Sequence, residues 1–534
     1  MCKENESITE RITQTPKVFF KSITFNDGTK ITLNHNSIIV FTGANNCGKS
    51  QVLRDAEYNL CTQNTPIIKH ATYDFCGNID DVNFLEKNFR LDRVGDYQAI
   101  ESGMHISKHS LHQCWNKQKF YGDLQKLFIK RLGTEFRLTA SNALNRSSNP
   151  EKHSIYKLFK SEVLSREISN YFHQAFGVDL VLNRNEMQTM PLHAGEAPDN
   201  EAYTIAQHDE YYAHVAKLPK LQNQGDGMRS FASILLDTFT SEQSVTLIDE
   251  PEAFLHPPQA RLLGKMLAKN NPTDRQLFLS THSEDFLQGL LDADNEDVTV
   301  VRINRKDNIN NMSVLNSDKI KELWSNPILR YSNILSGLFH EKVVICESDY
   351  DCLFYQAVMN AMYERKNEIA PDILFTHCGG KTRVKDVVSA LKAVNVPVVA
   401  VCDFDLLNSS NNFKPIIASF GLEWNESFSA PMKIIYDSMN AKSSNGNDAW
   451  AQIKKIGIAG FTGDEPAAYE KVEAICKQVG LFVVPVGEME CFDKTVSKEK
   501  KDWVYYVLEH YDLAVDPKLE SARKFVQEIV DFKI

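Results

Sequence analysis

The stretch Gly43-Ala-Asn-Asn-Cys-Gly48-Lys49-Ser50 follows an apolar run and decides how the first half of the chain is interpreted. Its spacing, GxxxxGKS, is that of a P-loop, whose glycines let backbone N–H groups wrap around phosphate oxygens. Lys49 would reach the β- and γ-phosphates, Ser50 would ligate Mg²⁺, and the N-terminus of the next helix would add its dipole. We therefore predict an ATP site. Its contact residues would be Gly43, Asn45, Asn46, Gly48, Lys49 and Ser50.

Two further motifs lie about two hundred residues downstream of the P-loop. An apolar run ends in Asp249 and Glu250, so that Asp249 would hold Mg²⁺ directly or through water. Glu250 beside it would polarise the attacking water. A second apolar run leads to His282, which alone would more often be a structural residue. Together with the other two motifs, a sensor of the γ-phosphate is the better interpretation of His282.

The order of these motifs resembles that of ATP-binding-cassette (ABC) ATPases of the SMC-like branch, over residues 15–335. The hexapeptide Gly225-Asp226-Gly227-Met228-Arg229-Ser230 lies where these families carry their signature motif, with Gly225 in place of the usual serine. The resemblance implies that Gly227 contacts nucleotide bound to a second subunit. It therefore implies a homodimer, or a higher homo-oligomer, formed through the ATPase domain. Residues 78–170 occupy the place of a helical insertion.

Carboxylates follow two predicted strands in the second half of the chain. Glu347 ends one strand and Asp351 lies four residues later, whereas Asp403 and Asp405 end the other strand. A helix starting after Glu347 would turn Glu347 and Asp351 toward one ion, and period-two geometry puts Asp403 and Asp405 on one side. Clustered carboxylates repel unless cations neutralise them, and Mg²⁺ or Mn²⁺ accept oxygen ligands. The pattern predicts metals suited to phosphodiester cleavage; a helix N-cap would explain Asp403 about as well if its motif stood alone.

The order of these acidic motifs resembles the TOPRIM fold, although Ser348 stands where that fold carries a glycine. An ATPase followed by TOPRIM resembles the overcoming-lysogenization-defect (OLD) nucleases along the whole chain. This resemblance implies that Glu490 completes the metal site and that Lys501 is a catalytic lysine. It also implies a role in bacterial antiviral defence, alone or with partner proteins such as those of retron systems. The predicted catalytic residues are then Glu250, His282, Glu347, Asp403 and Lys501, and the predicted metal ligands are Ser50, Asp249, Glu347, Asp351, Asp403, Asp405 and Glu490.

Strands that alternate with helices predict an α/β fold with parallel sheets covered on both faces. We expect an ABC-type P-loop ATPase domain at residues 1–335, with its helical insertion at about 78–170. A TOPRIM domain would follow at residues 336–534, with a flanked parallel sheet, a helical insertion and C-terminal helices. The predicted strands cover residues 17–25, 31–33, 37–41, 178–182, 244–248, 276–280, 342–346, 372–376, 396–402 and 481–484, and two predicted helices cover residues 350–365 and 384–394.

Bulk composition places the chain among ordinary globular proteins. Of its 534 residues, 59 are Lys or Arg and 70 are Asp or Glu, which gives a formal charge of −11. Its 11 cysteines form no CxxC pair, which favours a reducing cytoplasm. No apolar run reaches the ~20 residues of a membrane-spanning helix, so we expect no membrane partner.

Charge is distributed unevenly along the chain. Residues 105–165 carry 11 basic and 4 acidic side chains, a local charge of +7. Such a segment is either a solvated helical face or a surface that contacts a nucleic-acid backbone. The candidate phosphate contacts are Lys117, Lys119, Lys126, Lys130, Arg131 and Arg137.

These features predict an ATP-regulated, divalent-metal-dependent DNA endonuclease or nickase in antiphage defence. Its cofactors would be ATP and Mg²⁺, with Mn²⁺ as a second option at the TOPRIM site. The alternative is a non-nucleolytic, DNA-sensing ATPase or scaffold with a degenerate TOPRIM site, which Ser348 and Gly225 favour. A transporter ATPase would leave the acidic second half unexplained. The sequence leaves open whether ATP promotes or restrains cleavage.

Overall fold

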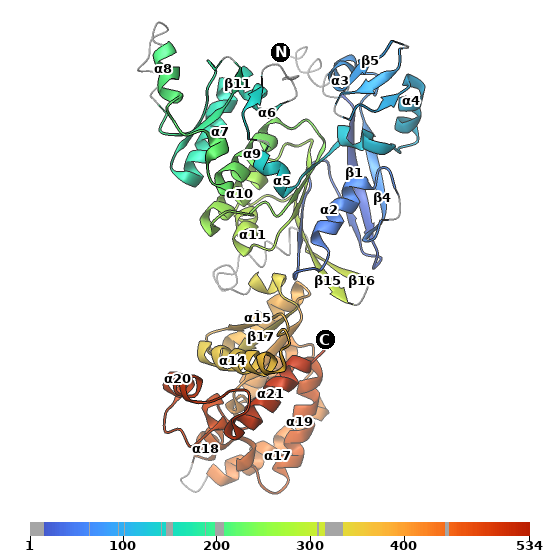
Figure 1. Cartoon of the computed structure of the whole chain (residues 1–534). Coiled ribbons are helices and arrows are strands. Elements are labelled where there is room, and N and C mark those ends of the chain that lie inside the picture. The colour runs from blue at the N-terminus through green and yellow to red at the C-terminus, as the bar shows by residue number, and fades with distance from the viewer. Residues whose placement is uncertain are drawn as a thin grey trace, which may run out of the picture. The chain divides into compact units, whose positions relative to one another are not determined.

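The computed structural model of the chain describes residues 15–62, 65–93, 95–100, 102–139, 141–145, 153–186, 188–197, 208–306, 309–315, 335–443 and 448–533. The chain divides into two compact units, Met1–Ile320 and Lys321–Ile534, which Figure 1 colours from blue to red along the sequence. The predicted domain boundary, between residues 335 and 336, closely follows residues 316–334, which lie outside the described part of the chain. In the described part of the chain, no helix is both long and apolar enough to cross a membrane.

The first unit is built on a six-stranded sheet with the order β16-β15-β3-β14-β13-β8. All neighbouring strands are parallel except β15 and β16. The strands β3 and β14 are buried at every residue, as expected when both faces of a parallel sheet are covered. The six strands are β3 (Ile38–Thr42), β8 (Ile129–Leu132), β13 (Val245–Asp249), β14 (Gln276–Ser280), β15 (Val298–Lys306) and β16 (Ile309–Leu315).

A three-stranded antiparallel sheet, β2-β1-β4, shares a core with the central sheet. Phe20 of β1 packs on Phe278 of β14, and Phe25 of β1 packs on Phe41 of β3. The helix α2 (Lys49–Tyr58), which follows the P-loop, contributes Val52 to this core. The three strands are β1 (Lys17–Phe25), β2 (Lys30–Thr32) and β4 (Ile68–Cys76).

Residues 78–170 differ from the predicted helical insertion because they contain strands as well as helices. Figure 1 shows their first part, from α3 to α4, beside β1 and β4. The strand β8 pairs with β13 in the central sheet. Its sequence, IKRL, is short and half basic, so its hydrophobic pattern is too weak to identify a sheet strand. The elements are α3 (Val82–Asn88), β5 (Phe89–Leu91), β6 (Tyr97–Ala99), β7 (His105–Ile106), α4 (Lys108–Asn116), η1 (Gly122–Leu127), β8, α5 (Thr134–Thr139), β9 (Leu144–Asn145), α6 (Ser154–Lys160) and α7 (Glu162–Phe176).

The remaining elements of the first unit include the helix that begins at the signature-like segment and the helices that follow the acidic strand end. Its longest helix after α7 is α9 (Asp226–Thr240), of which ten residues are buried. The helices α10 and α11 pack against each other (Figure 1). The other elements are β10 (Asp179–Leu182), β11 (Thr189–Met190), β12 (Leu192–Gly195), α8 (His208–Val215), η4 (Leu221–Asn223), α10 (Pro257–Lys269) and α11 (Glu284–Leu291).

The second unit contains a four-stranded parallel sheet with the order β18-β17-β19-β20. One face packs against α14, α20 and α21, where Phe354, Trp503 and Phe525 meet Val344 and Val399. The helix α15 contacts β17 and β19, and α19 contacts β20. The strands and these helices are β17 (Lys342–Cys346), α14 (Asp349–Lys366), β18 (Ile373–His377), α15 (Lys381–Ala393), β19 (Val398–Cys402), α19 (Glu465–Val479), β20 (Leu481–Val483), α20 (Lys500–His510) and α21 (Glu520–Asp531).

Helices occupy most of the long connection between β19 and β20, as expected of a helical insertion. They are η6 (Phe404–Asn408), α16 (Ser410–Ser419), α17 (Glu426–Ser443), α18 (Ala449–Ile456), η7 (Gly457–Gly460) and α19, while η5 (Leu335–Phe339), η8 (Met489–Phe492) and η9 (Pro517–Leu519) are short turns elsewhere. All ten predicted strands and both predicted helices are present, with ends shifted by at most a few residues.

Lys342 joins the first strand of the second unit to the last helix. Its Nζ donates hydrogen bonds to the carbonyl oxygens of Ile529, Val530 and Phe532, at 3.1, 2.7 and 2.8 Å. The last carbonyls of a helix lack partners within the helix, and a cation there also interacts favourably with the helix dipole. Lys342 therefore fixes the end of α21 to the start of β17, the strand that leads to Glu347.

We expect Lys342→Met to lower the free energy of unfolding by about 2 kcal/mol, because hydrogen bonds from a charged donor contribute about 1.5–3 kcal/mol. Urea denaturation followed by circular dichroism measures the change. The matched control is Lys524→Met on α21, whose side chain is 72% exposed and pairs with Glu520. We expect the control to change stability by less than about 0.5 kcal/mol. Equal losses in the two variants would contradict the anchoring role.

Candidate functional site

The predicted P-loop connects β3 to α2. Gly43 has a φ of 140°, and a Cβ atom at this position would collide with the carbonyl oxygen of Ile303. Lys49 is buried, and its Nζ donates to the carbonyl oxygens of Gly43 and Ala44 at 2.8 and 2.9 Å. Asn45 and Asn46 are exposed at the tip of the loop, and Gly48 precedes the first turn of α2. The lysine therefore lies inside a glycine-bounded loop at a helix N-terminus, which is a phosphate-binding arrangement.

Ser50 and Asp249 meet across the ends of α2 and β13. The Ser50 Oγ donates to Asp249 Oδ1 at 2.9 Å, and the Ser280 Oγ donates to the same oxygen. The parallel register that pairs Asp249 with Ser280 brings these groups to one edge of the sheet. A hydroxyl and a carboxylate placed in this way are a suitable ligand pair for the Mg²⁺ of a bound nucleotide.

Glu250 and His282 lie side by side beyond this pair. The His282 Nδ1 is 3.5 Å from Glu250 Oε1 and 3.6 Å from Glu252 Oε1. Glu252 is buried and accepts hydrogen bonds from Thr281 Oγ1 at 2.7 Å and from His282 N at 3.1 Å. Burial raises the pKa of Glu252. Glu252, which sequence reasoning missed, connects the acidic strand end to the loop that carries His282.

Arg137 is a further residue that sequence reasoning did not place at this site. Its side chain is fully buried, and it donates to the carbonyl oxygen of Glu250 at 3.0 Å and to Thr134 Oγ1 at 3.2 Å. Burial lowers the pKa of Arg137, while the charges of Glu252, Asp249 and Glu250 act in the opposite direction. The φ of Glu250 is 48°, in the left-handed region, so Arg137 holds a strained backbone segment in place.

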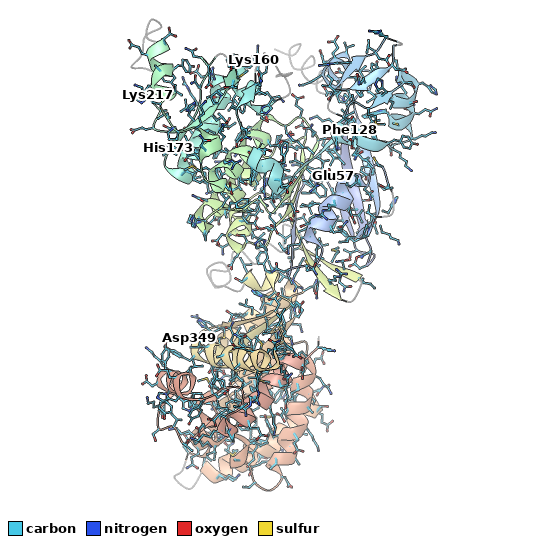
Figure 2. All side chains as sticks on the ribbon, viewed as in Figure 1. Glu57, Phe128, Lys160, His173, Lys217 and Asp349 are labelled. Carbon is cyan, nitrogen blue, oxygen red and sulfur yellow. The ribbon has the colours of Figure 1, made fainter. Side chains whose placement is uncertain are left out.

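The basic segment does not form one free cationic surface. Arg137 is buried, so the prediction that it contacts a nucleic-acid phosphate is wrong. The Arg131 Nε donates to Glu57 Oε2 at 2.6 Å, and Glu57 is labelled on α2 in Figure 2. Lys130 pairs with Asp237, Lys126 lies 3.0 Å from Asp123, and Lys117 and Lys119 are exposed. Intramolecular pairing thus accounts for much of the local charge, while residues 146–152 lie outside the described part of the chain.

The signature-like segment begins α9. A Cβ atom added to Gly227 would lie 2.6 Å from the carbonyl oxygen of Phe254, so the helix start packs closely on the loop after Glu250. Arg229 donates to the carbonyl oxygen of Leu138, and the Ser233 Oγ donates to that of Arg137. The helix is therefore hydrogen-bonded to the segment that holds Glu250. A contact between Gly227 and nucleotide on a second subunit stays a prediction.

Three carboxylates converge at the carboxyl edge of the parallel sheet in the second unit. Glu347 follows β17, whereas Asp403 and Asp405 follow β19. One oxygen from each side chain lies within 4.8 Å of the other two. The Glu347 Oε1 also accepts a hydrogen bond from Asp403 N at 3.1 Å. The fold therefore brings these three predicted ligands together.

Burial and mutual repulsion make Glu347 and Asp403 difficult to ionise without a cation. Burial, assisted by the charges of Asp405 and Asp351, raises the pKa of Glu347 to about 7. Burial and the charge of Glu347 hold the pKa of Asp403 well above its usual range. The buried Oδ1 of Asp405 accepts no hydrogen bond from the described residues. Oxygen ligands in this state fit a hard divalent cation such as Mg²⁺ or Mn²⁺.

Asp351 and Glu490 lie near this group but have other surroundings. Asp351 forms a capping box with Ser348, whose backbone N donates to Asp351 Oδ2 at 3.0 Å. Figure 2 labels Asp349 in the same first turn of α14. Burial raises the pKa of Asp351, and the charges of Glu490 and Glu488 raise it further. The φ of Ser348 is −129°, so this position does not require the glycine that is usual there.

Two lysines contact the acidic side chains. The Lys381 Nζ lies 2.9 Å from Asp405 Oδ2, and the Lys454 Nζ lies 2.9 Å from Glu488 Oε1 and 3.6 Å from Asp405 Oδ2. The hydrogen bond from Lys454 to Glu488 raises the pKa of Lys454. The predicted catalytic residue Lys501 instead lies at the start of α20, with its Nζ 5.6 Å from the centre of the Tyr505 ring. Its catalytic role stays a prediction.

The sequence offers different signals for these two lysines. Lys381 follows two glycines at the end of β18, the kind of turn that ends a strand and starts a helix. Lys454 lies within α18, about fifty residues after Asp405, and no motif marks it. Only the packing of the helical insertion places Lys454 beside the carboxylates.

Comparison with known proteins identifies two domain types in this order. Residues 135–287 match a family model described as "AAA domain, putative AbiEii toxin, Type IV TA system". Residues 338–405 match a model described as "Overcoming lysogenization defect protein-like, TOPRIM domain". A curated OLD nuclease from Thermus scotoductus is 28% identical over 174 residues, which cover 30% of this chain and 30% of that protein. The alignment thus spans less than a third of the relative.

Solved structures with partial similarity are SMC head domains. The SMC head bound to the C-terminal winged-helix domain of ScpA is 12% identical, with a TM-score of 0.35, and the alignment covers 56% of this chain and 99% of that one. The SMC head domain from Thermotoga maritima is 10% identical, with a TM-score of 0.30, and the alignment covers 57% and 100% of the two chains. The chain thus matches an AAA-type ATPase domain model at residues 135–287, followed by an OLD-like TOPRIM domain model at residues 338–405, and part of it is similar to an OLD nuclease.

Proposed function

We propose that this chain is an ATP-regulated, divalent-metal-dependent DNA endonuclease or nickase. The observation that carries the proposal is the convergence of Glu347, Asp403 and Asp405 at the strand ends of a TOPRIM domain. The same chain carries a P-loop with Ser50 beside Asp249, which supports nucleotide binding. The proposed setting, from the family resemblance, is bacterial antiphage defence in the cytoplasm, with or without partner proteins such as those of a retron.

The proposed cleavage chemistry uses the acidic cluster and its two lysines. Divalent ions held there would activate water and stabilise charge on the phosphate. Glu347, Asp403 and Asp405 would hold the first ion, while Asp351 and Glu490 extend the acidic surface toward a second. Lys381 and Lys454 already face these carboxylates. Their ammonium groups would orient the non-bridging oxygens of the scissile phosphate once the metals neutralise the acids.

The proposed ATPase chemistry uses the sheet edge of the first unit. Lys49 would bind the β- and γ-phosphates, and Ser50 and Asp249 would hold Mg²⁺. Glu250 would orient the attacking water, with His282 beside it as the γ-phosphate sensor. The hydrogen bonds from α9 to the segment of Arg137 provide a physical connection from the signature-like segment to Glu250. In a homodimer that encloses ATP, these hydrogen bonds would link the nucleotide contact of the signature-like segment to Glu250.

A non-nucleolytic DNA-sensing ATPase is the second candidate. The ion pairs of Lys381 with Asp405 and of Lys454 with Glu488 support it, because they neutralise part of the acidic cluster without a metal. In that case, added Mn²⁺ or Mg²⁺ would leave plasmid DNA intact while DNA still stimulates ATP hydrolysis. A plasmid-nicking assay, with and without ATP and with each metal, separates the two candidates.

We expect Glu250→Gln to lower ATP turnover by about 10²–10⁴-fold, the usual contribution of a group that handles the proton of the attacking water. ATP binding should persist in this variant, because the P-loop is intact. Lys49→Ala should instead weaken ATP binding by about tenfold or more, through loss of a charged hydrogen-bond donor. The exposed Lys69→Ala on β4 is the control and should behave as wild type. Filter binding measures ATP binding, and phosphate release measures ATP turnover. Full turnover by Glu250→Gln would contradict the role of Glu250 in orienting the attacking water.

We expect Asp403→Asn to reduce metal-dependent DNA cleavage by about 10- to 100-fold or more, since even outer-shell partners of bound metals contribute this much. ATP hydrolysis should remain, because Asp403 belongs to the TOPRIM domain. The exposed Asp386→Asn on α15 is the matched control and should cleave normally. Supercoiled-plasmid relaxation measures cleavage. Unchanged cleavage by Asp403→Asn would refute the nuclease site.

The pKa of Glu347, raised to about 7, predicts pH-dependent metal binding. Below that pH the metal-free carboxyl group is protonated, so a divalent ion must displace a proton to bind. The affinity for Mn²⁺ should therefore fall as the pH is lowered below about 7, by about tenfold per pH unit for each displaced proton. Calorimetric titration between pH 6 and pH 8 measures the slope. Glu347→Gln should show a shallower slope, and identical slopes would contradict the assignment.

A further inference from the structure

A separate group of potential metal ligands lies on the antiparallel sheet of the first unit. His35 lies in the turn between β2 and β3, and Asp74 and Cys76 lie on β4. One ligand atom from each of the three side chains lies within 4.8 Å of the other two. The P-loop follows the opposite end of β3, about 17 Å away along the strand at 3.3 Å per residue. The group is therefore distinct from the nucleotide site.

Strand geometry brings two of the ligands to one face. Asp74 and Cys76 are two residues apart on β4, and side chains at this spacing project from the same side of a strand. The His35 Nε2 is 2.8 Å from Asp74 Oδ2, and the Cys76 Sγ lies within 4.8 Å of a carboxylate oxygen of Asp74. The carboxylate thus lies between an imidazole and a thiol. All three side chains are partly exposed, so an ion can reach them from solvent.

The imidazole is held in place by the sheet itself. The Phe19 ring stacks on the His35 ring, with their centres 4.1 Å apart and an angle of 14° between their planes. Phe19 is only 2% exposed and pairs with Asp74 in the β1–β4 register. Stacking on a buried ring restricts the rotation of His35 and keeps its Nε2 directed toward Asp74. A pocket of about 400 Å³, lined in part by His35 and Asp74, leaves room for water beside them.

The ligand chemistry selects the type of ion. A nitrogen, an oxygen and a sulfur ligand suit a borderline ion such as Zn²⁺, whereas Mg²⁺ and Ca²⁺ prefer oxygen ligands alone. In a tetrahedral site with bonds of about 2.0–2.3 Å, ligand atoms lie roughly 3.5 Å apart. Small rotations of the Asp74 and Cys76 side chains would bring the three atoms to this spacing.

We propose that His35, Asp74 and Cys76 form a binding site for a transition-metal ion of the Zn²⁺ class, with water as the fourth ligand. The ion replaces the hydrogen bond that now joins His35 to Asp74. The Cys76 thiol releases its proton to solvent and binds as a thiolate, while His35 binds as the neutral imidazole. The bound ion joins the turn before β3 to β4, and so fixes the start of the strand that leads to the P-loop.

Co²⁺ is the probe of choice, because a thiolate bound to Co²⁺ produces a near-ultraviolet charge-transfer band that carboxylate and imidazole ligands do not give. The full chain carrying Asp403→Asn is titrated with Co²⁺, so that binding at the TOPRIM carboxylates is weakened. We expect the band to appear and to disappear when Zn²⁺ is added in excess. Cys76→Ser should abolish the band, and His35→Gln should weaken Co²⁺ binding at least about tenfold.

Two cysteine variants serve as matched controls. Cys61→Ser changes a partly buried thiol of the same unit, and Cys378→Ser changes a thiol close to Glu347. Both should retain the band. Circular dichroism of metal-free Cys76→Ser verifies that this variant folds, and Zn²⁺ should raise the unfolding temperature of the parent protein more than that of the variant. Absence of the band from the parent protein, or its persistence in Cys76→Ser, would overturn the proposal.

Discussion

Parallel pairing of buried strands is the constraint on which both candidate sites depend. Parallel strands start on one edge of a sheet and end on the other, so the residues that follow them meet at a single edge. In the first unit, Asp249 pairs with Ser280 and Ser280 pairs with Phe41, which places the acidic motif next to the P-loop. In the second unit, β17 pairs with β19, which brings Glu347 to Asp403. Residues that are far apart in sequence therefore become neighbours through backbone register alone.

The surroundings of the strand-end carboxylates differ between the two candidate sites. At the first site, charged and polar partners balance the acids, since Ser50 and Ser280 contact Asp249 and Arg137 lies beside Glu250. At the second site, one oxygen from each of three carboxylates lies within 4.8 Å of the other two, and Lys381 contacts only Asp405 among them. Burial and like charge then raise the pKa of Glu347 and Asp403. A divalent ion would relieve this repulsion, whereas Lys381 and Lys454 relieve only a part of it.

The hydrophobic pattern predicted most of the strands that carry these sites. Runs such as Ile38–Phe41 and Val398–Cys402 are continuous apolar segments, because parallel strands are covered on both faces. The strand Ile129–Leu132 was not predicted, because two of its four residues are basic. Its Lys130 and Arg131 pair with Asp237 and Glu57, which are distant in sequence. Neither partner lies within the basic segment, so the sequence of that segment alone indicated a charged surface.

The sequence by itself determined the P-loop, the acidic strand ends and the order of the two domains, because each depends on residues adjacent in the chain. Only the tertiary structure decided which side chains from distant parts of the chain contact these motifs or one another. It buried Arg137 against Glu250, placed Lys454 of the helical insertion beside Glu488, and gathered His35, Asp74 and Cys76 on one sheet face. Such contacts arise from helix packing and strand register between distant segments. Those are properties of the whole fold, and no local motif encodes them.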